Sequence, residues 1–239
     1  RFSASGAPDP TFDADGQVVT DFESRGDSGY GVLLQPDGAI IVTGSASVAN
    51  PFGLSDANLA AVRYSASGAL DTSFDGDGKT NANAAGAADF GYASALQPDG
   101  KIVIAGRVAN SGGANPDIGL IRFNADGGLD TDFGNAGVVR DATPDWDEAA
   151  DLVMQPDGKI VVVGHTVSGA VAMVTVARYN AACRKDVPFD PTRLDGKSTV
   201  GIEPIKTNWA EPPDAPPFRA YPVTCGVTFS FGGLQINTM

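Results

Sequence analysis

The sequence has few of the residues from which most catalytic and metal sites are built. Its 239 residues include two cysteines, Cys183 and Cys225, and a single histidine, His165. A zinc site needs several thiolate or imidazole ligands, and a Ser-His-Asp triad needs a histidine held between a serine and a carboxylate. No glycine-rich loop of either common phosphate-binding form occurs in the sequence. These absences argue against zinc chemistry, triad hydrolysis and nucleotide-driven chemistry.

Long apolar runs and basic clusters are also missing. No stretch approaches the roughly 20 apolar residues of a membrane-spanning helix. The net charge is −13, and a chain that binds nucleic acid needs a basic face to neutralise phosphates. We therefore expect no membrane span and no nucleic-acid partner.

Composition changes near residue 178. Residues 179–239 hold equal numbers of acidic and basic side chains, so the whole net charge of −13 falls in residues 1–178. Half of the 16 prolines and both cysteines lie in the last 61 residues. We therefore divide the chain into two parts, residues 1–178 and residues 179–239.

The first part is an internal repeat. The sequence QPDG follows Leu34, Leu96 and Met154, and Arg-aromatic pairs begin at the four arginines of the same period, namely Arg1, Arg63, Arg122 and Arg178. The arginines are separated by 62, 59 and 56 residues, and internal repetition of this kind indicates a solenoid or propeller architecture. The pattern predicts three units, about residues 1–62, 63–121 and 122–178.

Each unit reads as a short antiparallel meander. In QPDG, proline presets one turn position and glycine takes the last, so the apolar runs on either side form a hairpin. A third run ends at the Arg-aromatic pair, and a fourth short strand follows sequences such as LDTSF at residues 70–74. Such a meander cannot bury both faces alone. We therefore predict a mainly β fold of stacked antiparallel meanders, a partial propeller or solenoid, followed by a Pro-rich irregular C-terminal extension that ends in strands.

Residues 1–180 resemble the delta-60 repeat family of bacterial proteins. The matching sequences are LDTSFDGDG, LDTDFGNAG, LQPDGKIVIAG and ARYNA. The resemblance implies β-propeller-like arrays in secreted or surface proteins, without assigned chemistry. Three units are too few to close an ordinary propeller, so we expect an open sheet edge that takes further repeats or a protein partner.

Four aspartates in the repeat turns are candidates for weak calcium binding. They are Asp13 and Asp15 in DADG, and Asp75 and Asp77 in DGDG. An EF-hand loop needs more oxygen ligands and a closing glutamate, which both copies lack. The third copy reads GNAG and has no carboxylate. Two interpretations stay open, namely plain turns, which we favour, and a weak calcium site.

The recurring arginines have two interpretations as well. An arginine and an aspartate at a constant spacing of eight residues suit a bidentate pair between strands. This interpretation, which we favour over a ligand-binding stripe, pairs Arg63 with Asp71 and Arg122 with Asp130. Asp186 stands at the same spacing from Arg178.

Residues 179–239 resemble the C-terminal region of FAD-dependent tricarballylate dehydrogenases, in the fumarate reductase and succinate dehydrogenase flavoprotein group. YNAAC, FDPTRLDG, KTNWA and PPFRAYPVTCGVTFSFGGLQI carry the resemblance. It implies that Gly232 and Gly233 bring backbone close to the flavin. The dinucleotide-binding strand, turn and helix of that family are absent from this sequence. We therefore expect no cofactor in this chain, and FAD enters by resemblance only.

The two resemblances meet at residues 172–183. Read backwards, ARYNA is the end of a repeat strand; read forwards, YNAAC is the end of a flavoprotein helix. The valines and the threonine of residues 171–176 favour a strand weakly, so strand and helix both stay open. A disulfide between Cys183 and Cys225 also stays open, although the flavoprotein resemblance implies free thiols.

Two functions follow from these parts. We expect a non-catalytic β-repeat binding or structural module of a bacterial secreted or surface protein, fused to a flavoprotein fragment. The alternative is a fragment of a tricarballylate dehydrogenase or fumarate reductase-like oxidoreductase, inactive without its dinucleotide-binding domain. The repeats indicate an extracellular or surface location and the flavoprotein part a cytoplasmic one, and we favour the first. A fusion that is not a natural single gene product is a third interpretation.

Overall fold

Eleven β-strands make up the part of the chain that the structure describes. The computed structural model describes residues 1–49, 55–84, 88–109 and 115–180. The chain divides into the units Arg1–Pro188 and Phe189–Met239, and the second lies wholly outside the described residues. The strands are β1 (Asp27–Leu34), β2 (Ile40–Ala49), β3 (Ser55–Tyr64), β4 (Lys79–Ala82), β5 (Phe90–Leu96), β6 (Ile102–Val108), β7 (Asp117–Phe123), β8 (Val138–Asp141), β9 (Trp146–Met154), β10 (Ile160–Ser168) and β11 (Val171–Tyr179).

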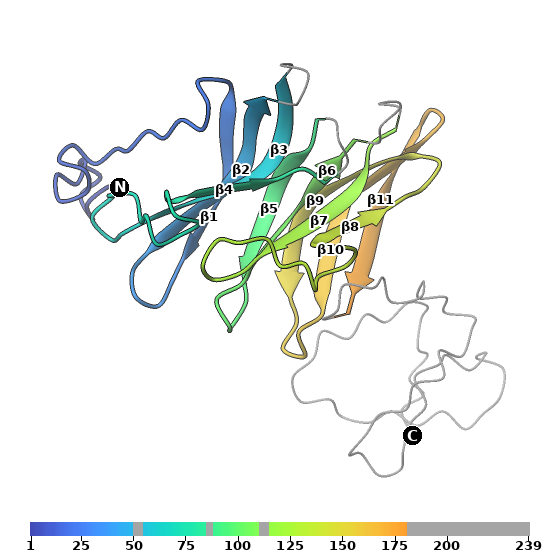
Figure 1. The fold of residues 1–239 in the computed structure, drawn as a ribbon. Helices are drawn as coiled ribbons and strands as arrows, with labels where there is room; N and C mark the ends of the chain where they lie inside the picture. The colour runs from blue at the N-terminus through green and yellow to red at the C-terminus, as the bar shows by residue number, and fades with distance from the viewer. Residues whose placement is uncertain (50–54, 85–87, 110–114, 181–239) are drawn as a thin grey trace, which may run out of the picture. The chain divides into compact units, whose positions relative to one another are not determined.

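The strands form three antiparallel sheets that follow one another along the chain (Figure 1). The first sheet has the order β1-β2-β3-β4 and the second the order β5-β6-β7-β8. In the third sheet β9, β10 and β11 are paired, with β10 in the middle. The predicted mainly β fold of stacked meanders is confirmed. Among the described residues no helix is long and apolar enough to cross a membrane.

The QPDG sequences form the hairpin turns that were predicted. The amide of Gln35 donates to the carbonyl of Ala39 at 2.9 Å, and the amide of Gly38 donates to the carbonyl of Gln35 at 2.9 Å. Gly38 has a φ of 88°, a backbone conformation that costs glycine little and other residues more. The same turn joins β5 to β6 and β9 to β10. The period seen in the sequence is therefore a period of hairpins.

A β-bulge interrupts the first strand of each sheet. The register shifts at Tyr30 in β1 and at Tyr92 in β5, and likewise between β9 and β10. A glycine faces each bulge across the ladder. A Cβ placed on Gly44 would lie 1.9 Å from the carbonyl oxygen of Ser28, and Gly106 and Gly164 are equally tight. No side chain fits at these positions, which explains why glycine recurs there.

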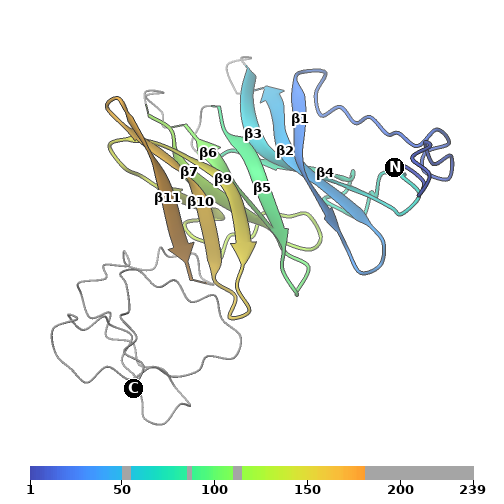
Figure 2. The same ribbon diagram turned by 180° about the vertical axis from the view of Figure 1, so that it is seen from behind.

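The first sheet neighbours the second and the second neighbours the third (Figure 2), and an apolar core lies between each of these two pairs. The core between the first and second sheets includes Leu59, Phe74, Ile104 and Phe123. The core between the second and third sheets is built in the same way, from Val103, Ile118, Leu120, Phe133, Leu152, Ile160, Val162 and Tyr179 among others. The second sheet contributes to both cores, which explains why its strand β7 is buried along its whole length.

The boundary between the two sequence resemblances falls at the end of a strand. Residues Val171–Tyr179 are β11, which pairs with β10 through nine residues in unbroken register. This observation decides between strand and helix for residues 171–179 in favour of strand. Cys183, Asp186, Cys225 and the glycine pair at Gly232 lie outside the described residues, and so does the whole flavoprotein-like part.

Candidate functional site

The recurring arginine of each unit lies in a cluster of side chains that we call a clasp. The clasp of the first sheet consists of Arg63, Asp71, Ser73 and Phe74, and the other copies hold the corresponding residues. The Nε of Arg63 donates to Oδ2 of Asp71 at 2.8 Å, and its Nη2 donates to the hydroxyl of Ser73 at 2.8 Å. The other carboxylate oxygen of Asp71 accepts from that hydroxyl at 2.6 Å. The guanidinium lies 4.8 Å from the centre of the Phe74 ring, within the range of a cation–π contact. The clasp thus uses the planar fork of arginine in several directions.

The clasp also binds the next repeat. The Nη1 of Arg63 donates to the carbonyl of Ala125 at 2.7 Å, and the amide of Asp75 donates to the carbonyl of Asp126 at 2.7 Å. Both acceptors lie in the turn that follows the third strand of the second sheet. Arg1 reaches Ala66 in the same way, at 2.9 Å. The clasps of Arg1 and Arg63 therefore each tie the end of one meander to the next meander, whereas Nη1 of Arg122 donates to Oε1 of Gln97 in its own sheet at 3.3 Å.

The clasp of the second sheet is the most buried. The Nε of Arg122 donates to Oδ2 of Asp130 at 2.7 Å, and Lys101 Nζ lies 2.7 Å from the same oxygen. The guanidinium stacks 4.4 Å from the centre of the Phe133 ring. The predicted pairs Arg63–Asp71 and Arg122–Asp130 are confirmed. Arg178 lies on β11, and its predicted partner Asp186 is outside the described residues.

The clasp keeps its carboxylates ionised. Hydrogen bonds from the Ser73 hydroxyl, with the charge of Arg63, lower the pKa of Asp71 below its ordinary value. Burial by itself would raise the pKa of Asp130, but hydrogen bonds from Lys101 and Arg122 outweigh it and lower the pKa. In the exposed first copy, hydrogen bonds from Thr11 and then Arg1 lower the pKa of Asp9 to about 2. The folded chain therefore favours the charged form at all three positions.

The four aspartates that were predicted as calcium candidates take part in turns. Asp15 Oδ1 accepts the amide of Gln17 at 2.8 Å, and Asp77 Oδ1 accepts the amide of Lys79 at 2.9 Å. Asp13 and Asp75 have positive φ angles of 48° and 53°, which aspartate tolerates better than most residues. Within the described ranges no group of three or more His, Cys, Asp or Glu residues is placed to hold a metal ion. Calcium binding at these loops stays a prediction.

The third copy of this loop shares one backbone feature with the first two copies. Gly134 stands where Asp13 and Asp75 stand in the earlier copies, and its φ is 61°. What the three copies share is therefore a left-handed backbone position, which glycine and aspartate can both take. The next positions differ, because φ is positive at Ala14 and Gly76 in the first two copies and at Ala136, one residue later in the loop, in the third.

A second repeated aspartate was missed in the sequence. Asp27, Asp89 and Asp147 open the first strands of the three sheets. The carboxylate of Asp89 accepts the amide of Ala84 at 2.7 Å and the amide of Ala109 at 3.1 Å, so it joins the preceding loop to the loop between β6 and β7. Asp27 accepts Phe22 and Ser47 amides in the same way. Their spacing equals that of the QPDG turns, which is the signal that could have revealed them.

The aromatic residue after each recurring arginine was also not given a role. The hydroxyl of Tyr64 donates to Thr20 at 2.6 Å, and that of Tyr179 donates to Asp141 at 3.1 Å. The corresponding residues in the next copy are Phe123 of β7 and Ala82 of β4, which share one apolar core. Tyrosine thus occurs where the facing residue accepts a hydrogen bond, and phenylalanine where it does not. This matching is a contact between sequential repeats.

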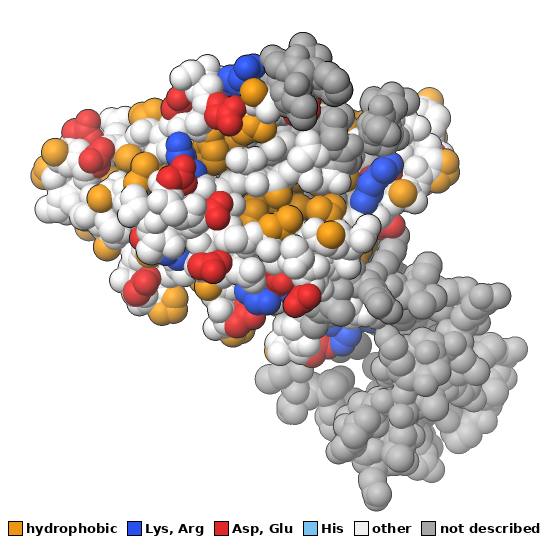
Figure 3. Space-filling model, in the orientation of Figure 1, with side chains coloured by type: hydrophobic (Ala, Val, Ile, Leu, Met, Phe, Trp, Pro, Cys, Tyr) orange, Lys and Arg blue, Asp and Glu red, His pale blue; other side chains and the backbone are white. Residues whose placement is uncertain are grey.

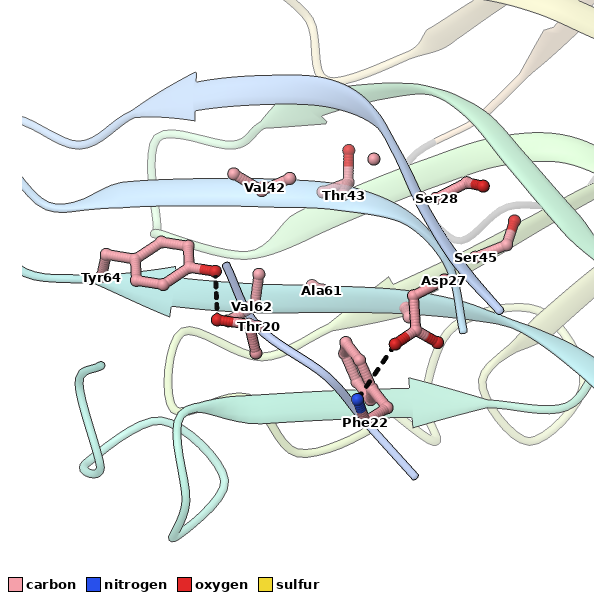
Figure 4. A pocket seen from close by; sticks show the side chains of 13 residues that line it. Thr20, Phe22, Asp27, Ser28, Val42, Thr43, Ser45, Ala61, Val62 and Tyr64 are labelled. Carbon is pink, nitrogen blue, oxygen red and sulfur yellow. Dashed lines mark hydrogen bonds between the residues drawn. The ribbon is translucent and has the colours of Figure 1, made fainter. Parts of the chain in front are cut away.

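A small pocket lies on the side of the first sheet that faces away from the second sheet (Figure 4). Its volume is about 150 Å³, and Thr20 and Phe22 of the N-terminal segment lie against it. The hydrogen bonds from Tyr64 to Thr20 and from the Phe22 amide to Asp27 hold this segment on the sheet. Small residues such as Gly29 and Gly44 form its floor. The pocket has a mixed lining, in which apolar residues such as Val42 and Val62 stand beside polar ones such as Asp27 and Tyr64.

Charged groups are dispersed over the molecule rather than gathered at one site. On the face shown in Figure 3, acidic side chains are spread over the described part, several of them beside lysine or arginine. His165 lies on β10 with its ring 5.1 Å from that of Trp146. The flavin-contacting residues implied by resemblance, Gly232 and Gly233, lie outside the described residues. The functional features in the described part are therefore the clasps and the open faces of the outer sheets.

Comparison with known proteins supports the repeat part. The model of the family described as "Domain of unknown function (DUF5122) beta-propeller" matches residues 35–74, 97–133 and 155–182. Each matched segment begins at or just after the start of a QPDG turn, and the first two end at Phe74 and Phe133, the phenylalanines of the clasps. No curated protein matches the chain. The repeat part of the chain is thus similar to a β-propeller family of unknown function.

Proposed function

We propose that residues 1–180 form a non-catalytic binding and structural module of a secreted or surface-exposed bacterial protein. The observation that carries this proposal is how the recurring polar side chains are used. Arg63, Asp71 and Asp89 each form hydrogen bonds with the backbone or side chains of adjoining loops and repeats. Residues conserved between repeats thus build a stack, and the interaction surfaces are the sheet faces and edges at its two ends.

The acidic, dispersed surface supports an extracellular location. A net charge of −13 keeps a chain soluble and disfavours contact with nucleic acid. The flavoprotein resemblance of residues 179–239 supports a second interpretation, an inactive fragment of an FAD-dependent oxidoreductase. The proposed module does not depend on any residue of the flavoprotein-like part.

A single preparation discriminates between the two functions. The full chain is purified without added cofactor, and its visible absorption spectrum is recorded before and after denaturation. We expect no flavin absorption, because the dinucleotide-binding turn and helix are absent from the sequence. A stoichiometric flavin spectrum that is released on denaturation would contradict the module and support the oxidoreductase fragment. Addition of FAD to the purified chain, followed by gel filtration, provides the matched control.

A further inference from the structure

The third sheet presents an apolar face that is covered in the other sheets. We call it the tail face and define it by Val153, Val163, Val174 and Val176. Val174 is 82% exposed, whereas its counterparts Leu59 and Ile118 are 0% and 2% exposed. Val176 is 67% exposed, and its counterparts in the first and second sheets, Ala61 and Leu120, are buried. The four valines therefore leave exposed apolar surface on a sheet that has no further neighbour among the described residues, and one charged side chain, Asp151, pairs with Val163 on the same face.

The first sheet presents the complementary face. We call it the head face and define it by Val32, Leu34, Ile40 and Val42. Val32 is 67% and Leu34 72% exposed. Their counterparts in the third sheet, Leu152 and Met154, pack in the core against the second sheet. The two ends of the stack thus carry the two halves of an interface that occurs twice inside the chain.

We propose that the tail face of one chain binds the head face of a second copy, and that two copies close head to tail into a dimer. This inference rests on the proposed role of the repeats as a binding and structural module. A contact between two different faces closes into a ring or continues as a filament. Two copies bring together six sheets, which lies within the about four to eight blades of closed propellers.

The side chains at the paired positions match. Between the first and second sheets, the hydroxyl of Thr43 donates to that of Ser94 at 2.8 Å. Between the second and third sheets, the same two positions hold Ala105 and Leu152, which share one apolar core. Across the proposed contact these positions hold Val163 and Val32. A polar residue faces a polar one inside the chain, and the two apolar residues left at the ends face each other.

The pocket on the head face fits a side chain of the tail face. Inside the chain, Leu59 of the first sheet lies against Gly91 of the second, 3.5 Å from where a Cβ on that glycine would stand. The counterpart of Gly91 in the first sheet is Gly29, which lines the pocket of about 150 Å³. The counterpart of Leu59 in the third sheet is Val174. Val174 of one copy therefore enters the pocket at Gly29 of the other.

The two chains also meet at one corner. Arg1 and Phe2 are the repeat counterparts of Arg178 and Tyr179, so both pairs would take the same place in the dimer. Phe2 is 70% exposed and forms only an isolated bridge with Pro8. Docking of the partner's β11 therefore requires the first two residues to leave this place, and Arg1 then gives up its bonds to Asp9, Thr11 and Ala66.

The test is the mass of the full chain in solution, measured by gel filtration with light scattering. We expect twice the chain mass of 24.4 kDa for the unaltered protein. Val174→Asp and Val32→Asp should each raise the dissociation constant by at least about 100-fold, because each places a charge in both contacts of the closed dimer. Thr131→Asp is the control: Thr131 is exposed and lies in the loop between β7 and β8 of the middle sheet, away from both end faces. It should leave the dimer unchanged.

Mixing the two variants tests the head-to-tail geometry. A Val174→Asp chain keeps its head face, and a Val32→Asp chain keeps its tail face, so an equimolar mixture regains one intact contact and partial dimer. Circular dichroism of each variant checks that it is folded. An unaltered chain that is monomeric, or a dimer that survives Val32→Asp, overturns the inference; the first result would mean that another segment or partner covers the tail face. Neither result bears on the flavin test, which decides the proposed function separately.

Discussion

The second and third sheets have similar sequences and strand orders, yet only the second is covered on both faces. Leu120 in β7 is fully buried, and Val176 at the same position in β11 is 67% exposed. The local pattern of apolar residues is alike in the two strands, so the difference comes from the neighbouring sheet. The sequence of a repeat therefore supplies an apolar sheet face, and whether that face is buried depends on whether another sheet packs against it.

The largest difference between the two sheets is expected when the residue at the same position of each sheet is replaced by alanine. Leu120→Ala leaves a cavity in the core between two sheets and should lower the free energy of unfolding by about 2–5 kcal/mol. Val176→Ala removes exposed surface and should change it by less than about 0.5 kcal/mol. Denaturant titration of the full chain, at a concentration where it is monomeric, measures both. Equal losses would show that the tail face is covered within the same chain.

A smaller effect is expected in the clasp of the second sheet. Asp130→Asn removes the charge that Arg122 and Lys101 share, and both cations lie close to it at 2.7 Å. The loss of charged hydrogen bonds should lower the free energy of unfolding by about 1.5–3 kcal/mol. Asp9→Asn is the matched control in the exposed first copy, where solvent replaces the lost interactions. A cost at Asp9 as large as that at Asp130 would contradict the role of burial.

The pH dependence of stability provides a third comparison. The pKa values of Asp71 and Asp130 are lowered in the folded chain from the ordinary value of 3.8. Their contribution is therefore fully present above about pH 4 and is lost as the pH falls through the lower folded pKa values. The double variant Asp71→Asn, Asp130→Asn should lose less stability than the unaltered chain between pH 4 and pH 2. Melting temperatures recorded across this range measure the difference, and parallel curves would contradict it.

The smallest effect concerns the aromatic position that follows each arginine. Tyr64→Phe removes a hydrogen bond to Thr20 and should cost about 0.5–1.5 kcal/mol. Phe123→Tyr places a hydroxyl in the apolar core beside Ala82 and should cost at least as much. The reverse pair, Phe123→Tyr with Ala82→Thr, should recover part of that loss. Denaturant midpoints compare the variants, and the absence of any recovery would show that the two positions are not coupled.

The period of the sequence predicted the sheets, their hairpins and the pairing of Arg63 with Asp71, because each of these depends on residues near one another in the chain. Three features depend on neighbouring repeats and were not predicted. They are the reach of Arg63 to the Ala125 carbonyl, the role of Asp89 between two loops, and the matching of Tyr64 with Thr20. The carbonyl has no sequence signal, since every residue carries one. The aspartates had a signal in their spacing, and the aromatic pairs had one only when two repeats were compared.

The candidate ligand residues were harder to judge from sequence. Asp75 and Asp77 occur in a calcium-like string, but that string also describes a turn with a left-handed position, and in the third copy Gly134 takes that position. Similar sequences in a turn therefore indicate a similar backbone conformation more reliably than they indicate a metal site.

The bulge in the first strand of every sheet has a consequence for how such chains change over time. A Cβ at Gly44, Gly106 or Gly164 would collide with the carbonyl opposite the bulge, so each hairpin has one permitted alignment that is set entirely within its own repeat. A duplicated or deleted repeat therefore cannot shift the alignment of its neighbours. A gene that encodes this glycine and bulge in every repeat can therefore gain or lose one whole repeat at a time, and the strands of each new copy pair in the same register.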